Sequence, residues 1–292
     1  MPIYVNTTKL GMTAFANSQK LKNVKIGNKK VWTAWALKKT PYSLDRGLAA
    51  WYNGNIHVFG GVNHSKNHYS FDGESWTQKT NLPFDCASGQ AIVFNNEIHV
   101  VGGDDSSSSM QHYKYNGSSW SSVSTLPGIL VFGSAVVYND ELHILGVGSS
   151  YKGHYKWNGS TWVSVSTIPV AMRYCCAAIY NNKLYLVGGA SVNDRHCKYY
   201  DGSWHDGINT PFFAGQSALI TFNNELHLLG ASSGSNLHYV LNGNAWVSAI
   251  NIPFNYSYKG FAILPDSFFL AGNESGTTNN AQFDGIAWTS GT

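Results

Sequence analysis

The chain has 292 residues, of which 12% are charged and 14% aromatic, and it contains 30 glycines. Its net charge of +3 is unevenly divided: residues 1–40 hold eight lysines and no acidic residue, whereas residues 41–292 hold eleven basic and sixteen acidic residues. No apolar run approaches the roughly 20 residues of a membrane-spanning helix, so a membrane partner is not expected.

Residues 1–40 form a basic N-terminal segment that differs in composition from the rest of the chain. Within it, the stretch from Val24 to Trp32 predicts a β-hairpin with Gly27-Asn28 at its turn. Trp32 and Trp35 each carry a large apolar surface that favours docking over exposure to water. A charge asymmetry of this kind is typical of an interaction arm, and a solvated tail is the alternative interpretation. Interleaved lysine and tryptophan are weak evidence for a nucleic-acid partner, which we do not expect.

From residue 41 onward the sequence repeats six times. The period is 42 residues, except for one step of 44 that contains the stretch from Asp104 to Gln111. Self-similarity at such a period indicates a repeat array rather than a single globular core. The repeat is marked by a tryptophan at positions 76, 120, 162, 204, 246 and 288, followed by a proline at 83, 127, 169, 211 and 253.

Each copy predicts four short strands. A first apolar strand, such as 91–94, is followed by a two-residue turn such as Asn95-Asn96 and by an alternating strand such as 97–101. Asparagine and glycine tolerate the positive φ that a tight hairpin turn demands. A third strand ends at a second tight turn, such as Asn116-Gly117, and the fourth strand carries the tryptophan. Four antiparallel strands per repeat predict blades around a central channel, each built from contiguous chain.

The diglycines Gly60-Gly61, Gly102-Gly103 and Gly188-Gly189, each followed by a tryptophan, resemble the kelch repeat of β-propellers. The resemblance covers roughly residues 41–292 and implies an all-β, six-bladed kelch-type β-propeller behind a short basic segment. The Asn/Asp-Gly turn before the tryptophan is also similar to the Asp-box of sialidases. In this chain the glycine directly follows the acid, and a sialidase would need three clustered arginines, whereas the chain has only three in all.

A second resemblance concerns the stretch from Gly27 to Trp32. It looks like short Lys/Val/Trp hairpins near the start of structural proteins in tailed phages and prophages of Gram-positive bacteria. This resemblance implies that Lys29, Lys30, Trp32 and Trp35 dock the chain to other virion structural proteins. Because no basic-then-apolar leader is visible, we expect synthesis in the bacterial cytoplasm and assembly into the tail or baseplate of a virion.

Histidines and cysteines do not predict a metal site or a cofactor. Eight of the eleven histidines occupy two repeated strand positions, and equivalent residues of different blades lie too far apart to share an ion. The second strand carries histidine at positions 57, 99, 143 and 227, and the third strand carries it at 68, 112, 154 and 238. The four cysteines lack metal-ligand spacing, and we expect them to be reduced. We expect no catalytic residues.

The long loops predict the binding face, because the other face carries only two-residue turns. Aromatic rings beside polar groups suit a sugar or a partner protein, and packing of the same rings between blades is the alternative. The candidate ligand-binding residues are Phe84, Asp104, Asp105, Tyr151, Arg173, Tyr174, Arg195, Phe213, Tyr256 and Tyr258.

The sequence therefore predicts a non-enzymatic virion protein of a phage or phage-like particle. Residues 1–40 would dock to the particle, and residues 41–292 would bind a partner protein or a host-surface glycan. The alternative is a sugar-modifying kelch enzyme, such as a sialate-type epimerase, that acts at the same loop face.

Overall fold

The structure is a computed structural model. It describes the backbone of residues 15–16, 19–20, 24–26 and 29–31 and all atoms of 37–103, 110–191, 194–230, 235–256, 260–271 and 278–291. The chain divides into two compact units, Met1–Ala36 and Leu37–Thr292. In the first, β1 (Phe15–Ala16) pairs with β2 (Gln19–Lys20), and β3 (Val24–Ile26) pairs with β4 (Lys29–Val31) across the predicted turn. Trp32, Trp35 and the side chains of Lys29 and Lys30 lie outside the described residues.

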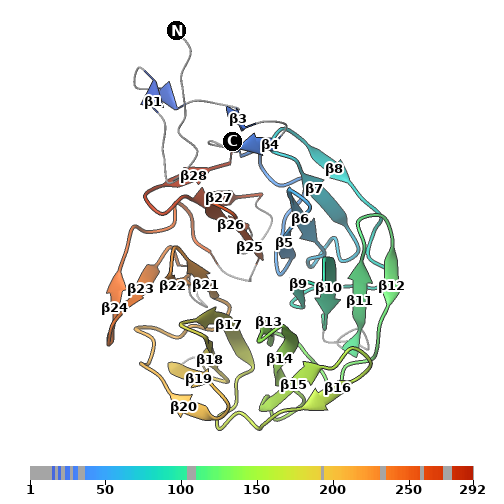
Figure 1. Ribbon diagram of the computed structural model, residues 1–292, viewed down its shortest axis with the longest axis vertical. Helices are drawn as coiled ribbons and strands as arrows, with labels where there is room; N and C mark the ends of the chain where they lie inside the picture. The colour runs from blue at the N-terminus through green and yellow to red at the C-terminus, as the bar shows by residue number, and fades with distance from the viewer. Residues whose placement is uncertain are drawn as a thin grey trace. The chain divides into compact units, whose positions relative to one another are not determined.

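The second unit consists of six four-stranded antiparallel sheets arranged in chain order around a central channel (Figure 1). Every strand pairs with its neighbours in sequence, so each blade is built from contiguous chain, as predicted. The first blade is β5 (Leu48–Tyr52), β6 (Asn55–Phe59), β7 (His68–Phe71) and β8 (Trp76–Gln78). The second is β9 (Gln90–Phe94), β10 (Glu97–Val101), β11 (His112–Tyr115) and β12 (Trp120–Ser122). The third is β13 (Ser134–Tyr138), β14 (Glu141–Val147), β15 (Gly153–Trp157) and β16 (Trp162–Ser164).

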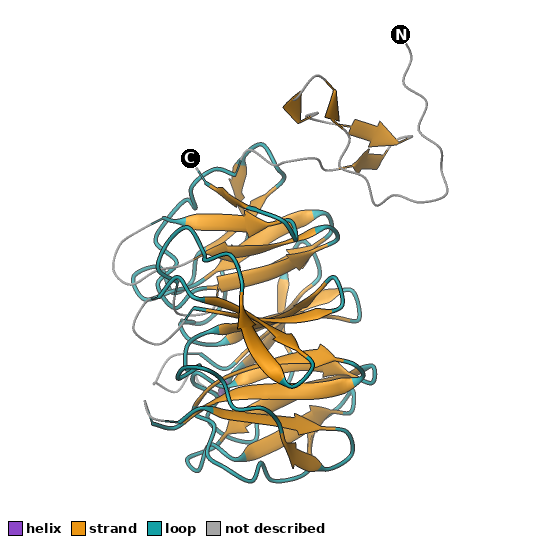
Figure 2. Cartoon of the chain, turned by 90° about the vertical axis from the view of Figure 1, so that its left-hand side faces the viewer, coloured by secondary structure: helices purple, strands orange, loops and turns teal. Residues whose placement is uncertain are grey.

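The remaining three blades follow the same plan, and the described residues contain no α-helix. The fourth blade is β17 (Tyr174–Tyr180), β18 (Lys183–Gly189), β19 (His196–Tyr200) and β20 (Trp204–Asp206). The fifth is β21 (Ala218–Phe222), β22 (Glu225–Leu229), β23 (His238–Asn242) and β24 (Ala245–Ser248). The sixth is β25 (Gly260–Leu264), β26 (Ser267–Ala271), β27 (Asn280–Phe283) and β28 (Trp288–Ser290). Seen from the side, the strands run between two faces formed by turns and loops (Figure 2).

The tight turns form as the sequence predicts. Asn95 and Asn96 both adopt left-handed backbone, with φ of 49° and 59°. At the second turn of the first blade, Asp72 Oδ1 accepts hydrogen bonds from the backbone N–H groups of Glu74 and Ser75, at 2.8 Å each. Such side-chain bonds to the following backbone fix the turn and explain why asparagine or aspartate recurs there.

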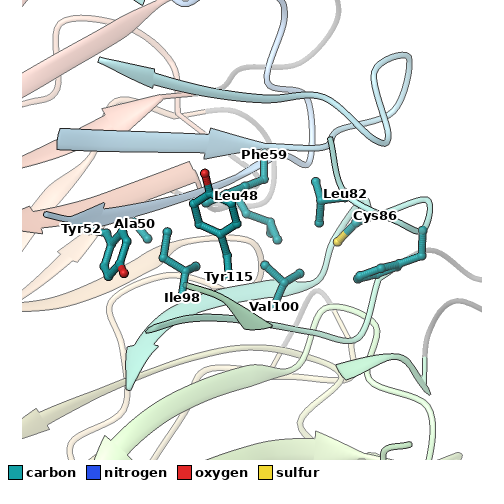
Figure 3. Close-up of a cluster of buried hydrophobic side chains, with 10 residues drawn as sticks. Leu48, Ala50, Tyr52, Phe59, Leu82, Cys86, Ile98, Val100 and Tyr115 are labelled. Carbon is teal, nitrogen blue, oxygen red and sulfur yellow. The ribbon is translucent and has the colours of Figure 1, made fainter. Parts of the chain in front are cut away.

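Hydrophobic cores lie between adjacent blades rather than inside one blade. Figure 3 shows the core between the first two blades, where Phe59 and Leu48 of the first meet Ile98, Val100 and Tyr115 of the second. The diglycine lets the next blade approach closely: a Cβ on Gly102 (φ 71°) would lie 2.2 Å from the carbonyl oxygen of Leu130. Glycine at this position is therefore required by packing as well as by backbone conformation.

Residues 37–40, which the sequence analysis placed in the N-terminal segment, close the ring. Between neighbouring blades, a linker carbonyl such as that of Thr80 accepts bonds from His68 of one blade (3.1 Å) and from Trp120 of the next (2.9 Å). At the seam, the carbonyl of Lys38 takes this role. It accepts bonds from Asn280 Nδ2 of the sixth blade (2.9 Å) and from Trp76 Nε1 of the first (3.5 Å). The adjacent Thr40 N–H donates to the carbonyl of Thr278 at 3.3 Å.

The repeated histidines of one blade contact each other, which the sequence analysis did not predict. Nδ1 of the second-strand histidine lies 2.8–2.9 Å from Nε2 of the third-strand histidine in the first, second, third and fifth blades. All eight rings are buried. Burial lowers the pKa of His99 to about 4 and that of His112 to about 3, so these pairs are neutral at physiological pH. In the fourth blade Tyr185 and Cys197 take the two places.

Candidate functional site

The candidate site is built on one repeated backbone position at the loop face. Arg46, Ser88, Phe132 and Gln216 precede the first strands of their blades at intervals of one or two repeats, and all adopt left-handed backbone with φ between 56° and 64°. Tyr174 occupies the same position at the start of β17. Backbone bonds join successive blades here: Ser88 N–H donates to Arg46 O (2.8 Å), and Phe132 N–H donates to Ser88 O (3.1 Å). These residues therefore surround the loop-face end of the central channel, which we call the mouth.

A continuous row of aromatic and cationic side chains follows this ring. The Arg46 guanidinium lies 5.6 Å from the centre of the Phe132 ring, which lies 4.9 Å from that of Tyr174. Tyr174 in turn contacts Phe213 edge-on at 6.5 Å. Arginine over an aromatic face is attracted by the ring's quadrupole, so the row holds its guanidinium groups in defined places.

Arg173 extends the row toward the β14–β15 loop. Its guanidinium lies 5.1 Å from the centre of the Tyr174 ring and 5.4 Å from that of Tyr151. Tyr151 is fixed at the tip of that loop, because its N–H donates to Gly148 O (3.0 Å) and its carbonyl accepts from Met172 N–H (2.9 Å). Arg173 thus bridges two aromatic rings that come from different loops.

Several polar atoms at the mouth are buried without a hydrogen-bond partner among the described residues. They are Arg173 Nε, Gln216 Oε1 and Asp45 Oδ1. Burial raises the pKa of the Asp45 carboxyl, and the adjacent Arg46 guanidinium opposes that rise. Unsatisfied buried polar groups are costly, so a ligand that completes their hydrogen bonds would be favoured.

The channel behind the mouth is a cavity of about 390 Å³ lined by the first strands of all six blades. Alanine, valine, isoleucine and leucine dominate its wall, with Trp51 and Phe261 as the aromatic residues and Gln90 and Thr221 as the polar ones. None of these lining residues is ionisable. The channel therefore presents an apolar floor beneath the polar mouth, which is the usual pattern of a ligand site.

The structure brings together four of the ten predicted site residues: Tyr151, Arg173, Tyr174 and Phe213. Phe84 and Tyr256 lie instead in cores between blades, with exposed fractions of 7% and 0%. These two rings pack between blades, which is the alternative that the sequence left open. Arg195 is exposed, and its carbonyl accepts a bond from Thr210 N–H at 3.1 Å. Asp104, Asp105 and Tyr258 lie outside the described residues.

The sequence analysis did not single out Asp45, Arg46 or Gln216. Arginine, serine, phenylalanine, tyrosine and glutamine share the repeated position, so no residue type marks it. Spacing is the signal that could have found it, because the position recurs at the period of the repeat. Within the described parts of the chain, no group of three or more His, Cys, Asp or Glu side chains could hold a metal ion. The same parts contain no helix that is long and apolar enough to span a membrane.

Comparisons with known proteins agree with this geometry. A kelch domain-containing protein of Saccharolobus solfataricus is 34% identical over 71 residues, which are 24% of this chain and 10% of that protein. The solved structure of YjhT superposes with a TM-score of 0.74 at 13% identity, over 88% of this chain and all of that one. The fold is a kelch-type β-propeller.

The matched stretch spans only about a tenth of the length of the Saccharolobus protein. A scan against models of protein families finds no match. The resemblance of the N-terminal segment to phage structural proteins has no counterpart among these relatives and stays a prediction.

Proposed function

We propose that this kelch-type propeller is a non-enzymatic binding protein whose mouth takes a glycan or a segment of a partner protein. The observation that carries the proposal is the row from Arg46 through Phe132 and Tyr174 to Arg173, set above an apolar channel. The half-buried rings of Tyr151 and Tyr174 can stack on the apolar faces of sugar rings, while guanidinium and amide groups bond the sugar hydroxyls. Phe132 is only 6% exposed and supports Tyr174 by packing against it. Unpartnered polar atoms at Arg173 and Gln216 support a ligand rich in hydrogen-bonding groups.

We further propose that the protein is a component of a virion. Residues 1–40 would attach it to other structural proteins of a phage tail or baseplate, and the mouth would bind a partner protein or a host-surface glycan. Support comes from the eight lysines of this segment, from its predicted and observed β3–β4 hairpin, and from its resemblance to phage structural proteins. A non-virion binding protein would share the mouth chemistry but not this attachment.

The test is a binding screen with full-length protein on an array of bacterial-surface glycans. Tyr174→Ala and Arg173→Ala should weaken binding by about 1–3 kcal/mol, the range for one well-placed anchor. Ser160→Ala, on the opposite face next to the Asn158-Gly159 turn, is the matched control and should bind like the unmodified chain. Binding that is equal in all four proteins would refute the mouth as the site.

A sugar-modifying enzyme is the second candidate, and one observation favours it. Asp45 is the mouth carboxyl whose pKa is raised by burial, as a proton-transferring group requires. Turnover of a sugar on the same array, lost in Asp45→Asn but retained in Ser160→Ala, would replace the binding function by catalysis. Binding by the unmodified protein without any turnover would support the first proposal.

A further inference from the structure

A second surface lies between the fifth and sixth blades, away from the mouth. It is a groove with a cavity volume of about 580 Å³. We call it the rim groove and define it by four aliphatic side chains: Val240, Val247, Ile250 and Ile286. Three of them are strongly exposed, with fractions of 48% for Val247, 59% for Ile250 and 72% for Ile286.

The other blades act as internal controls for this apolar character. Val240 and Val247 lie opposite each other on β23 and β24. The same opposite positions hold Ser70 and Thr77 in the first blade, Lys114 and Ser121 in the second, Lys156 and Val163 in the third, Tyr199 and His205 in the fourth, and Gln282 and Thr289 in the sixth, so that of the six blades the fifth has two aliphatic residues there. The fold therefore does not require aliphatic residues at this pair.

The two isoleucines depart from the repeat in the same way. In the tight turn before the tryptophan, Ile286 takes the place held by Glu74, Ser118 and Ser160. In the linker, Ile250 takes the place of Thr80, whose carbonyl makes the equivalent bond to a tryptophan of the following blade. The fourth blade also has an isoleucine there, Ile208, but it is half-buried against a core, whereas Ile250 is 59% exposed. Exposed aliphatic residues that gather in one groove mark an interaction site rather than a core.

The groove is preformed. The carbonyl of Ile250 accepts bonds from His238 Nδ1 (2.9 Å) and Trp288 Nε1 (3.0 Å), which fix this linker against both blades. At the turn end, a Cβ on Gly285 would lie 2.7 Å from Asn223 Nδ2, so the two turns are in close contact. A rigid groove loses little conformational entropy when a partner binds.

Charge indicates the chemistry of the partner. Residues 212–292, which contain both blades, hold four acidic residues and one lysine. Glu225 borders the groove, and 59% of its side chain is exposed. An aliphatic side chain would bury apolar surface in the groove, and a neighbouring cation would complement this acidic sector.

We propose that the rim groove binds an extended segment of another protein in which an aliphatic anchor is flanked by lysine or arginine. The anchor contacts Val247, Ile250 and Ile286, and a flanking cation pairs with Glu225. This site is independent of the mouth and of its ligand.

The test uses full-length protein and an array of ten-residue peptides, each with one central leucine or isoleucine. One set carries flanking lysines, and a matched set carries flanking glutamates. Lysine-flanked peptides should bind, and affinity should fall at least tenfold in Ile250→Ser, in Ile286→Ser and in Glu225→Lys. Ile129→Ser removes an aliphatic residue that is 46% exposed elsewhere, and it should leave peptide binding unchanged. Tyr174→Ala at the mouth should also leave it unchanged.

Each other outcome overturns the proposal. Equal binding of the two peptide sets would remove the charge argument, and binding that survives both isoleucine substitutions would place the peptide elsewhere. A dimer in sedimentation experiments that Ile286→Ser dissociates would assign the groove to a second copy of this chain. Circular dichroism spectra of the variants that match the unmodified protein confirm that loss of binding is not loss of fold.

Discussion

The buried histidine pairs predict that the propeller loses stability in mild acid. A histidine whose pKa is lowered in the folded state stays neutral there, whereas the unfolded chain binds a proton near its ordinary pKa of about 6.5. Stability is therefore fully present above pH 6.5 and is lost as pH falls toward the folded-state values. Those values are about 4 for His99 and about 3 for His112.

The magnitude follows from linkage. At pH 5 each such histidine favours the unfolded state by about 2 kcal/mol, because it is neutral when folded and about 97% protonated when unfolded. Three further pairs, in the first, third and fifth blades, have the same direction of shift. The seven histidines whose pKa is lowered to about 3–4 would together remove an amount comparable to the roughly 5–15 kcal/mol by which a folded protein is usually stable, and His227 acts in the same direction. We therefore expect cooperative unfolding before pH 5 is reached.

The chain itself supplies the variants for this experiment. Tyr185 with Cys197 in the fourth blade, and Phe269 with Asn280 in the sixth, are the natural replacements of a histidine pair. In the second blade, His99→Tyr with His112→Cys, or His99→Phe with His112→Asn, removes one pair.

Urea unfolding measured between pH 8 and 6, where the protein is still folded, gives the dependence of stability on pH. Removing the pair should decrease that slope by about 2 kcal/mol per pH unit near pH 6, because about 1.5 fewer protons are taken up on unfolding there. A slope that does not change when the pair is removed would show that these histidines are not held neutral in the fold.

Two further predictions concern the scaffold. Deleting residues 1–36 should leave a cooperatively folding propeller. Deletion through Thr40 should lower its free energy of unfolding in urea by about 2–4 kcal/mol, because it also removes the Lys38 carbonyl bonds and the buried Leu37. Equal stability of the two truncated proteins would refute the role of residues 37–40 in closing the ring. Gly102→Ala should destabilise the propeller strongly. Gly159→Ala should lower the free energy of unfolding by only about 1 kcal/mol, because the added Cβ has open space around it although φ is 96°. Equal losses of stability for the two variants in thermal unfolding would contradict the packing argument.

Much of the scaffold could be predicted because its determinants are local. Tight turns such as Asn95-Asn96 and the tryptophans of the fourth strands identify each hairpin without knowledge of long-range contacts. The histidine contacts could not be predicted in this way, because they depend on the register between second and third strands. That register is the same across loops of different length: the loop of the fourth blade is one residue longer than that of the third, yet Cys197 lies opposite Val187 as His154 lies opposite Leu145.

The boundary of the propeller shows a signal that the sequence did contain. Pro41 lies 42 residues before Pro83, so it occupies the position of the closing proline in the linker before the first blade. Residues 37–40 therefore correspond to the linker that follows every other blade. The mouth was only partly predictable for a different reason. Its side chains are brought together by backbone geometry at a repeated position, whereas Phe84 and Tyr256 are just as aromatic but belong to the hydrophobic cores between blades.

Hydrogen–deuterium exchange with the tightest-binding glycan from the array tests most directly whether the mouth is the binding site. The account predicts that the glycan slows exchange in peptides that contain Arg46, Phe132 and Arg173-Tyr174, and that exchange near Asn116-Gly117 on the opposite face stays unchanged. Protection at the opposite face or at the rim groove, with none at the mouth, would contradict it.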